Sequence, residues 1–157
     1  MKTGLATILL LNLLPLLGCS SSDSADPTSS LYAHFLIGTW TEVRGQTTLV
    51  FGDNNRYLEK REGKLGSGTW QLDDNTLHIT LTRFTLNGVA VQGLRGSYSL
   101  SVSIRGITMN ATMDCSTVQI RVADESVPNA QSTAASIQAA MRSDCQAGPE
   151  GILIKQL

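Results

Sequence analysis

The chain has 157 residues, of which 16% are charged and 5% are aromatic, and its formal net charge is −1. A near-neutral chain of this kind offers no basic surface for nucleic acid and no electrostatic attraction to anionic lipid. These two classes of partner are therefore excluded at the outset.

Residues 1–18 have the features of a signal sequence. Lys2 supplies a positive charge, and an apolar run from Leu5 to Leu17 follows. This run suits a signal sequence and is too short for a stable transmembrane helix. The segment Leu16-Leu17-Gly18-Cys19 then resembles the lipobox of bacterial lipoprotein precursors. The resemblance implies that residues 1–18 are a lipoprotein signal peptide, with cleavage before Cys19, transfer of diacylglycerol to its thiol and N-acylation.

Residues 19–30 are predicted to be a lipidated, serine-rich tether, and several acyl chains suffice for stable anchoring. Ser20 stands where an aspartate is associated with retention in the inner membrane of enteric-type bacteria. We therefore expect the protein to be anchored to the outer membrane and to face the periplasm. The alternative is an ordinary secretory signal followed by an incidental cysteine.

Residues 31–157 are predicted to form a single β-rich periplasmic domain, opening with a short helical turn within Leu31–Ile37. On the order of 125 residues are enough for one hydrophobic core. Apolar and polar residues alternate along Leu77–Leu81, Tyr98–Ile104 and Ile107–Met113, as in half-buried antiparallel strands. Turn residues separate such runs, and we count about nine strands. The expected fold is mainly β, an antiparallel β-barrel or β-sandwich.

One C-terminal amphipathic helix interrupts this pattern. Ser126 suits its N-cap and Pro128 its first turn. A last strand is expected from Gly151 to Leu157. The apolar stripe of the helix, with steps of three and four residues, consists of Val127, Ala130, Ala134, Ile137 and Met141.

Two cysteines remain once Cys19 is acylated, namely Cys115 and Cys145. In an oxidising periplasm such a pair is more often a disulfide than a metal or redox site. Cys115 is expected to follow a strand that ends at Met113, and Cys145 to follow the last turn of the helix. The disulfide would therefore join the end of the helix to the sheet.

Gly38-Thr39-Trp40 recurs thirty residues later as Gly68-Thr69-Trp70, with Leu49-Val50-Phe51 and Arg56-Tyr57-Leu58 between them. Through these motifs the first part of the domain resembles small lipocalin-like (calycin-type) domains. In such domains a Gly-x-Trp opens the first strand, and its tryptophan plugs one end of the barrel. A second likeness, to META-type lipoprotein domains, covers the segment from Gly96 to Met141. Neither resemblance specifies a ligand.

We expect no enzyme activity, no metal site and no cofactor. His34 and His78 are the only histidines, and His78 falls on the polar face of a predicted strand. The serines of Ser97–Ser103 lack a nucleophile-elbow motif and a His/Asp partner pattern. The charge run Glu59–Glu62 is typical of a solvated hairpin.

The sequence favours a non-catalytic binding or assembly lipoprotein. In size and β-content it is similar to the pilotins of secretion systems, which hold the amphipathic tail of a secretin, so a protein client is the first expected partner. Trp40, Trp70 and Phe84 are the candidate lining of an apolar binding site. The alternatives are a lipocalin-like carrier of a small apolar ligand and an envelope-stress or inhibitor protein.

Overall fold

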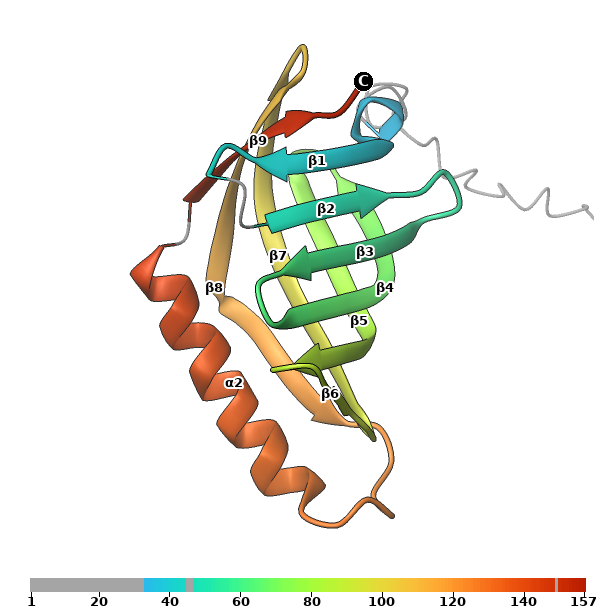
Figure 1. Ribbon diagram of the computed structural model, residues 1–157, viewed down its shortest axis with the longest axis vertical. Coiled ribbons are helices and arrows are strands. Elements are labelled where there is room, and N and C mark those ends of the chain that lie inside the picture. The colour runs from blue at the N-terminus through green and yellow to red at the C-terminus, as the bar shows by residue number, and fades with distance from the viewer. Residues whose placement is uncertain (1–32, 45–46, 149) are drawn as a thin grey trace, which may run out of the picture.

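Nine strands and one long helix make up the computed structural model over the residues it describes, which are 33–44, 47–148 and 150–157 (Figure 1). The predicted signal peptide, the predicted lipidation site Cys19 and the predicted tether lie outside these residues. The elements are β1 (Gly38–Glu42), β2 (Thr47–Phe51), β3 (Arg56–Arg61), β4 (Lys64–Asp73), β5 (Thr76–Leu86), β6 (Val89–Val91), β7 (Leu94–Arg105), β8 (Thr108–Val122), α2 (Ala130–Ala147) and β9 (Glu150–Lys155).

The sheet closes on itself, so the fold is a β-barrel and not a sandwich. Every pairing is antiparallel, and eight strands follow one another around the ring in chain order, with β6 as a short extra strand on β5. β9 closes the ring against β1, where Thr41 pairs with Ile154. Closure pairs each of the eight ring strands with a neighbour on both sides, although β8 extends beyond its pairing with β9.

The alternation of apolar residues marks the faces of the strands that point into the barrel. Leu77, Ile79 and Leu81 of β5 are all buried, as are Leu100 and Val102 of β7. The intervening polar residues lie on the outside. The predicted period-two pattern is thus confirmed, and its apolar face is the interior of the barrel.

One end of the barrel is filled by aromatic side chains. Trp40 is 0% exposed, and its Nε1 donates to the carbonyl oxygen of Leu36 at 2.7 Å. Leu36 ends a helical turn over residues 33–36, which confirms the predicted turn before β1. Trp70 donates to the Gly52 carbonyl at 3.1 Å, and its ring meets that of Phe51 edge-on at 5.8 Å. We call this the closed end.

A bulge at Gly68 brings β4 very near β5. The register of the β4–β5 pair shifts between Ser67 and Gly68. A Cβ atom added at Gly68 would overlap the backbone carbonyl of Thr80. Only glycine allows this close approach, so the pairing of β4 with β5 requires a glycine at position 68.

Helix α2 lies along the outside of β8 (Figure 1). Its buried face includes Ala134 and Ile137, as the apolar stripe predicted. The predicted start was wrong, because the helix begins after Asn129, which adopts a left-handed conformation with φ 60°. Ser126 does not cap it, because its hydroxyl donates to Asp124 Oδ1 at 2.6 Å in a turn before the helix. Pro128 likewise precedes the first turn.

Strand β8 is longer than expected, and both cysteines lie at positions in the fold that differ from those predicted. Cys115 lies in the middle of β8 rather than beyond its end, and Cys145 lies within the last turn of α2. β9 pairs only with the first part of β8, residues 108–112. Farther along, side chains of α2 bond the same edge, because Gln138 accepts from Ile120 N and Arg142 donates to the Val118 carbonyl. The helix therefore covers the part of the edge that β9 leaves open.

Among the described residues, no helix combines the length and the hydrophobicity needed to cross a membrane.

Candidate functional site

The half of the barrel away from the closed end contains a cavity of about 190 Å³. It lies beside the C-terminal half of α2, where Met141 and Cys145 form part of its wall. The remaining wall is built largely from inward-facing side chains of different strands. The buried aliphatic ones are Leu49, Leu81, Leu100, Ala111 and Leu153.

Two of the inward-facing residues on the cavity wall are small. Gly66 of β4 faces inward opposite Glu59, and a Cβ atom there would lie 3.1 Å from Leu81 Cδ2. Ala111 of β8 is buried and faces inward, but its side chain is a single methyl group, whereas other inward-facing residues of β8 carry longer side chains. Since interiors are normally close-packed, the short side chain of Ala111 accounts for part of the cavity, whereas Leu81 fills the space beside Gly66.

A carboxylate and two tyrosines form a hydrogen-bonded group on the cavity wall. Tyr98 donates to Glu59 Oε2 at 2.8 Å, and Tyr57 lies within 3.3 Å of the same oxygen. The two tyrosine hydroxyls are 2.9 Å apart, so Tyr57 can donate to either neighbour. Both tyrosines are buried and Glu59 is partly buried. We call these three residues the Glu59 cluster.

The tyrosines of the Glu59 cluster stay protonated at neutral pH. Burial, and next the negative charge of Glu59, raise the pKa of Tyr57 well above the ordinary tyrosine value. The same two causes, in the same order, raise the pKa of Tyr98. Burial disfavours the charged phenolate, and a carboxylate at hydrogen-bond distance repels it further. The cluster therefore carries one negative charge, on Glu59, and two neutral hydroxyls.

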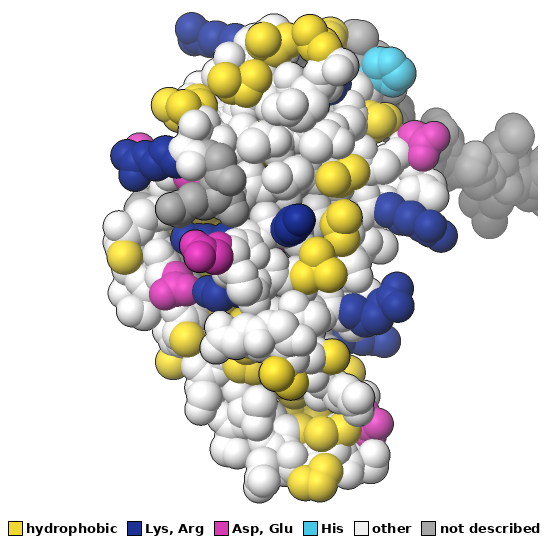
Figure 2. Space-filling model, in the orientation of Figure 1, with side chains coloured by type: hydrophobic (Ala, Val, Ile, Leu, Met, Phe, Trp, Pro, Cys, Tyr) yellow, Lys and Arg dark blue, Asp and Glu magenta, His cyan; other side chains and the backbone are white. Residues whose placement is uncertain are grey.

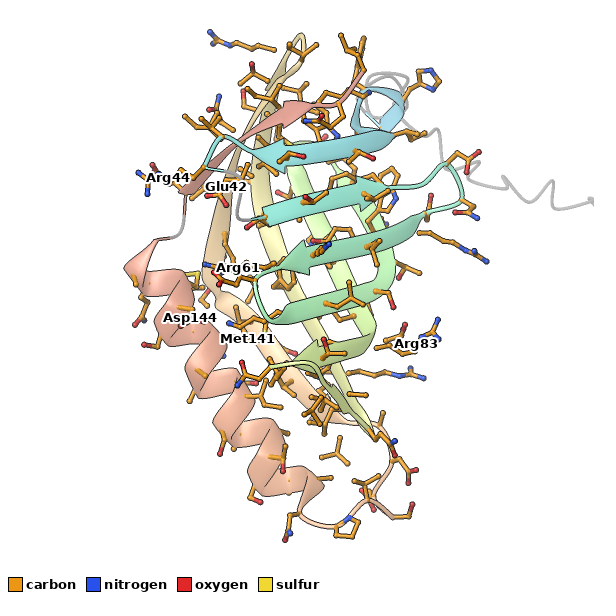
Figure 3. All side chains as sticks on the ribbon, viewed as in Figure 1. Glu42, Arg44, Arg61, Arg83, Met141 and Asp144 are labelled. Atoms are coloured by element: carbon orange, nitrogen blue, oxygen red, sulfur yellow. A yellow bond between two sulfur atoms is a disulfide. The ribbon has the colours of Figure 1, made fainter. Side chains whose placement is uncertain are left out.

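Charged side chains form the rim of the cavity. Arg61 and Lys64 pair in register on β3 and β4, and Lys64 Nζ meets Asp144 Oδ2 of α2 at 2.8 Å. The hydrogen bond and charge of Lys64 lower the pKa of Asp144. Figure 3 shows Arg61, Asp144 and Met141 together where α2 approaches β3, with Arg83 on the opposite side of the barrel. Figure 2 shows acidic and basic side chains intermingled at this rim.

The structure separates the aromatic residues that were predicted to line a binding site. Trp40 and Trp70 pack at the closed end, and the described wall of the cavity includes neither of them. Phe84 does lie on the wall. His78 is exposed, and its Nδ1 is 3.0 Å from Ser99 Oγ. Within the described ranges, no group of three metal-ligating side chains comes together.

The interpretation of residues 59–62 as a solvated hairpin is confirmed for three of the four and was wrong for Glu59. Glu59 is partly buried and lines the cavity, whereas Lys60, Arg61 and Glu62 are exposed, with Arg61 at the cavity rim and Glu62 in the turn. A signal was present in the sequence, because Tyr57, Glu59 and Arg61 alternate along one face of β3. Only the closed barrel shows that this face points inward.

Comparisons of the chain with protein-family models, with curated proteins and with solved structures found no match.

Proposed function

We propose that this protein is a non-catalytic binding protein that holds a small, largely apolar molecule in the open half of its barrel. The cavity of about 190 Å³ carries the proposal, because most of its surface is apolar, a hydrogen-bonded polar cluster lies on its wall and charged side chains lie at its rim. Preformed concave sites of this composition are the usual form of small-molecule sites. Acylation at Cys19 would keep the carrier at the outer membrane, facing the periplasm.

The dimensions of the cavity limit the ligand. An apolar cavity of about 150 Å³ holds a molecule the size of benzene, so a cavity of 190 Å³ suits a ligand with roughly six to ten non-hydrogen atoms inside the barrel. Its apolar body would contact Leu81, Leu100 and Leu153. The neighbouring hydroxyls and carboxylate are placed to orient a polar group.

Filling the cavity tests the proposal. Ala111→Leu would extend a side chain into the space, whereas Ala90→Leu adds the same atoms on the exposed strand β6. Three probes with the same chain length, n-octanol, n-octylammonium and octanoate, are titrated by calorimetry and by amide NMR. We expect saturable binding of at least one probe, a loss of about tenfold or more in its affinity in Ala111→Leu, and wild-type affinity in Ala90→Leu.

Far-ultraviolet circular dichroism first establishes that both variants are folded, since overpacking itself costs stability. If wild-type protein binds none of the three probes, or if Ala111→Leu binds them unchanged, the cavity is not a ligand site of this class.

The assembly role expected from the sequence is the second candidate, and a strip of exposed aliphatic side chains favours it. Ile152 and Ile154 face outward on β9, and Val43 follows β1 with its amide bonded to the Ile152 carbonyl at 2.9 Å. Their exposed fractions are 53%, 38% and 61%. Figure 2 shows hydrophobic side chains gathered over this part of the barrel.

A secretin-tail peptide distinguishes the two candidates. Shifts in the amide NMR signals of β9 and β1, and their loss in Ile152→Ser, would support the assembly role. Shifts confined to the cavity wall with the octyl probes, with no response to the peptide, support the carrier.

A further inference from the structure

The cavity and its rim carry more negative than positive side chains. Among the residues lining it, the carboxylates are Glu42, Glu59, Asp144 and Glu150, and the cations are Arg61 and Lys64. Four against two leaves a formal excess of two negative charges, although the whole chain carries only −1. Lys64 is already engaged with Asp144. A cationic ligand would thus be favoured on entry.

The Glu59 cluster is rich in hydrogen-bond acceptors. Its four side-chain oxygens share two protons, one from each tyrosine hydroxyl. Tyr98 donates its proton to Glu59, and Tyr57 donates to Tyr98 or to Glu59. Both protons are therefore used within the cluster, which then offers a ligand lone pairs and negative charge. Among the described residues, the hydrogen bonds to Glu59 all end on Oε2, so Oε1 is available.

An anionic head group would be disfavoured at this position. It would meet the Glu59 carboxylate in partly buried surroundings, where like charges repel more strongly than in water. It would also find both tyrosine protons already engaged. A neutral apolar molecule would fill the space and leave the carboxylate without a charged partner.

We infer that the ligand is a small organic cation, an ammonium group on a short apolar body, whose nitrogen pairs with Glu59. This inference rests on the proposed function, since it names the head group of the molecule held in the same cavity. The three N–H donors of a primary ammonium match Glu59 Oε1 and the lone pairs of the two tyrosine oxygens. The hydrocarbon body then lies against Leu81 and Leu100 on the cavity wall.

The three octyl probes test the head group, because they differ little elsewhere. At pH 7 we expect n-octylammonium to bind about tenfold or more tightly than n-octanol, since hydrogen bonds to charged groups are the stronger class. Octanoate should bind more weakly than n-octanol. Glu59→Gln preserves the shape of the side chain and should abolish the ammonium preference, so that n-octylammonium binds no more tightly than n-octanol. Glu125→Gln, at an exposed loop position, is the matched control and should behave like wild type.

A measurement on the wild-type protein covers the case in which Glu59→Gln does not fold. In the bound n-octylammonium, the methylene next to nitrogen should give nuclear Overhauser contacts to the rings of Tyr57 and Tyr98. Contacts from the terminal methyl group instead would place the head group at the rim and overturn the inference.

The outcomes separate this inference from the proposed function. Equal affinity for n-octylammonium and n-octanol, a preference that survives in Glu59→Gln, or tightest binding of octanoate would overturn the organic-cation assignment while the cavity stays a ligand site. Failure of all three probes would instead overturn the carrier function itself.

Discussion

Cys115 and Cys145 join the middle of β8 to the last turn of α2, with their Cα atoms 5.7 Å apart. The predicted disulfide is confirmed. The disulfide lies where β8 stops pairing with β9 and begins to contact α2. Cys145 also forms part of the cavity wall. The bond thus fixes the helix against the barrel beside the cavity that we propose as the binding site.

Removing this disulfide should destabilise the domain substantially. The two cysteines are 30 residues apart, and the chain-entropy account gives roughly 3–4 kcal/mol for a loop of this length. We expect Cys115→Ser/Cys145→Ser to lower the free energy of unfolding by about that amount in urea titrations. Peptide mapping without reductant should recover the two cysteine peptides linked. Two alkylatable thiols in the native protein would contradict the structure.

Gly68→Ala should be far more damaging than other glycine substitutions in the sheet. The new methyl group would overlap the Thr80 carbonyl, so β4 and β5 would have to separate where they close the barrel. Gly151→Ala on β9 is the matched control, because its methyl group meets only Leu153 Cδ1 at 3.9 Å. We expect Gly68→Ala to lower the unfolding midpoint strongly and Gly151→Ala to leave it nearly unchanged or raised. Equal melting temperatures would contradict the close approach.

Much of the fold followed from periodicity, because alternation identifies the inner face of a strand without knowledge of its neighbours. Leu77, Ile79 and Leu81 were assigned correctly on that basis. Closure into a barrel was not predictable in this way, since the same faces would fill a sandwich. Pairing between β9 and β1, which closes the ring, joins the two ends of the domain and leaves no local pattern in the sequence.

The candidate site was harder to predict than the fold. Glu59 is charged and stands in a run of charged residues, so its local pattern is that of a solvent-exposed hairpin. Its burial depends on Tyr98, which lies 39 residues away and donates to it. The aromatic signal pointed to Trp40 and Trp70, which fill the closed end instead. An apolar side chain predicts that a residue faces the barrel interior. It does not show whether the interior at that position is close-packed or contains a cavity.

Trp40 should matter for stability and give no optical response to ligand. It is fully buried at the closed end, and the cavity wall contains neither it nor Trp70 among the described residues. Trp40→Ala should therefore cost roughly 3–5 kcal/mol, as for other large core truncations. The tryptophan emission of wild-type protein should stay constant while the octyl probes are titrated. A saturable emission shift would mean that ligand reaches the closed end.

Cys19→Ser tests the predicted lipid anchor, which lies outside the described residues. If the lipobox directs processing, the variant should accumulate as a precursor and incorporate no labelled palmitate, whereas wild-type protein should be recovered with the outer membrane. Replacing Ser20 by Asp should move the protein to the inner membrane of an enteric-type host. Normal processing of Cys19→Ser would show that an ordinary signal sequence is at work.

Alkaline pH should unfold the barrel through the Glu59 cluster. The pKa values of Tyr57 and Tyr98 are raised in the folded protein, chiefly by burial and then by the Glu59 charge. Because folding raises these values, their contribution to stability is fully present below the ordinary tyrosine pKa of about 10 and is lost as pH rises through the folded values. We expect the two tyrosinate absorbance steps to coincide with the loss of β-sheet circular dichroism above about pH 10. Tyr98→Phe should remove the absorbance step of Tyr98 and move the unfolding transition to higher pH. Ionisation of both tyrosines near pH 10 with the sheet intact would show that solvent reaches the cluster.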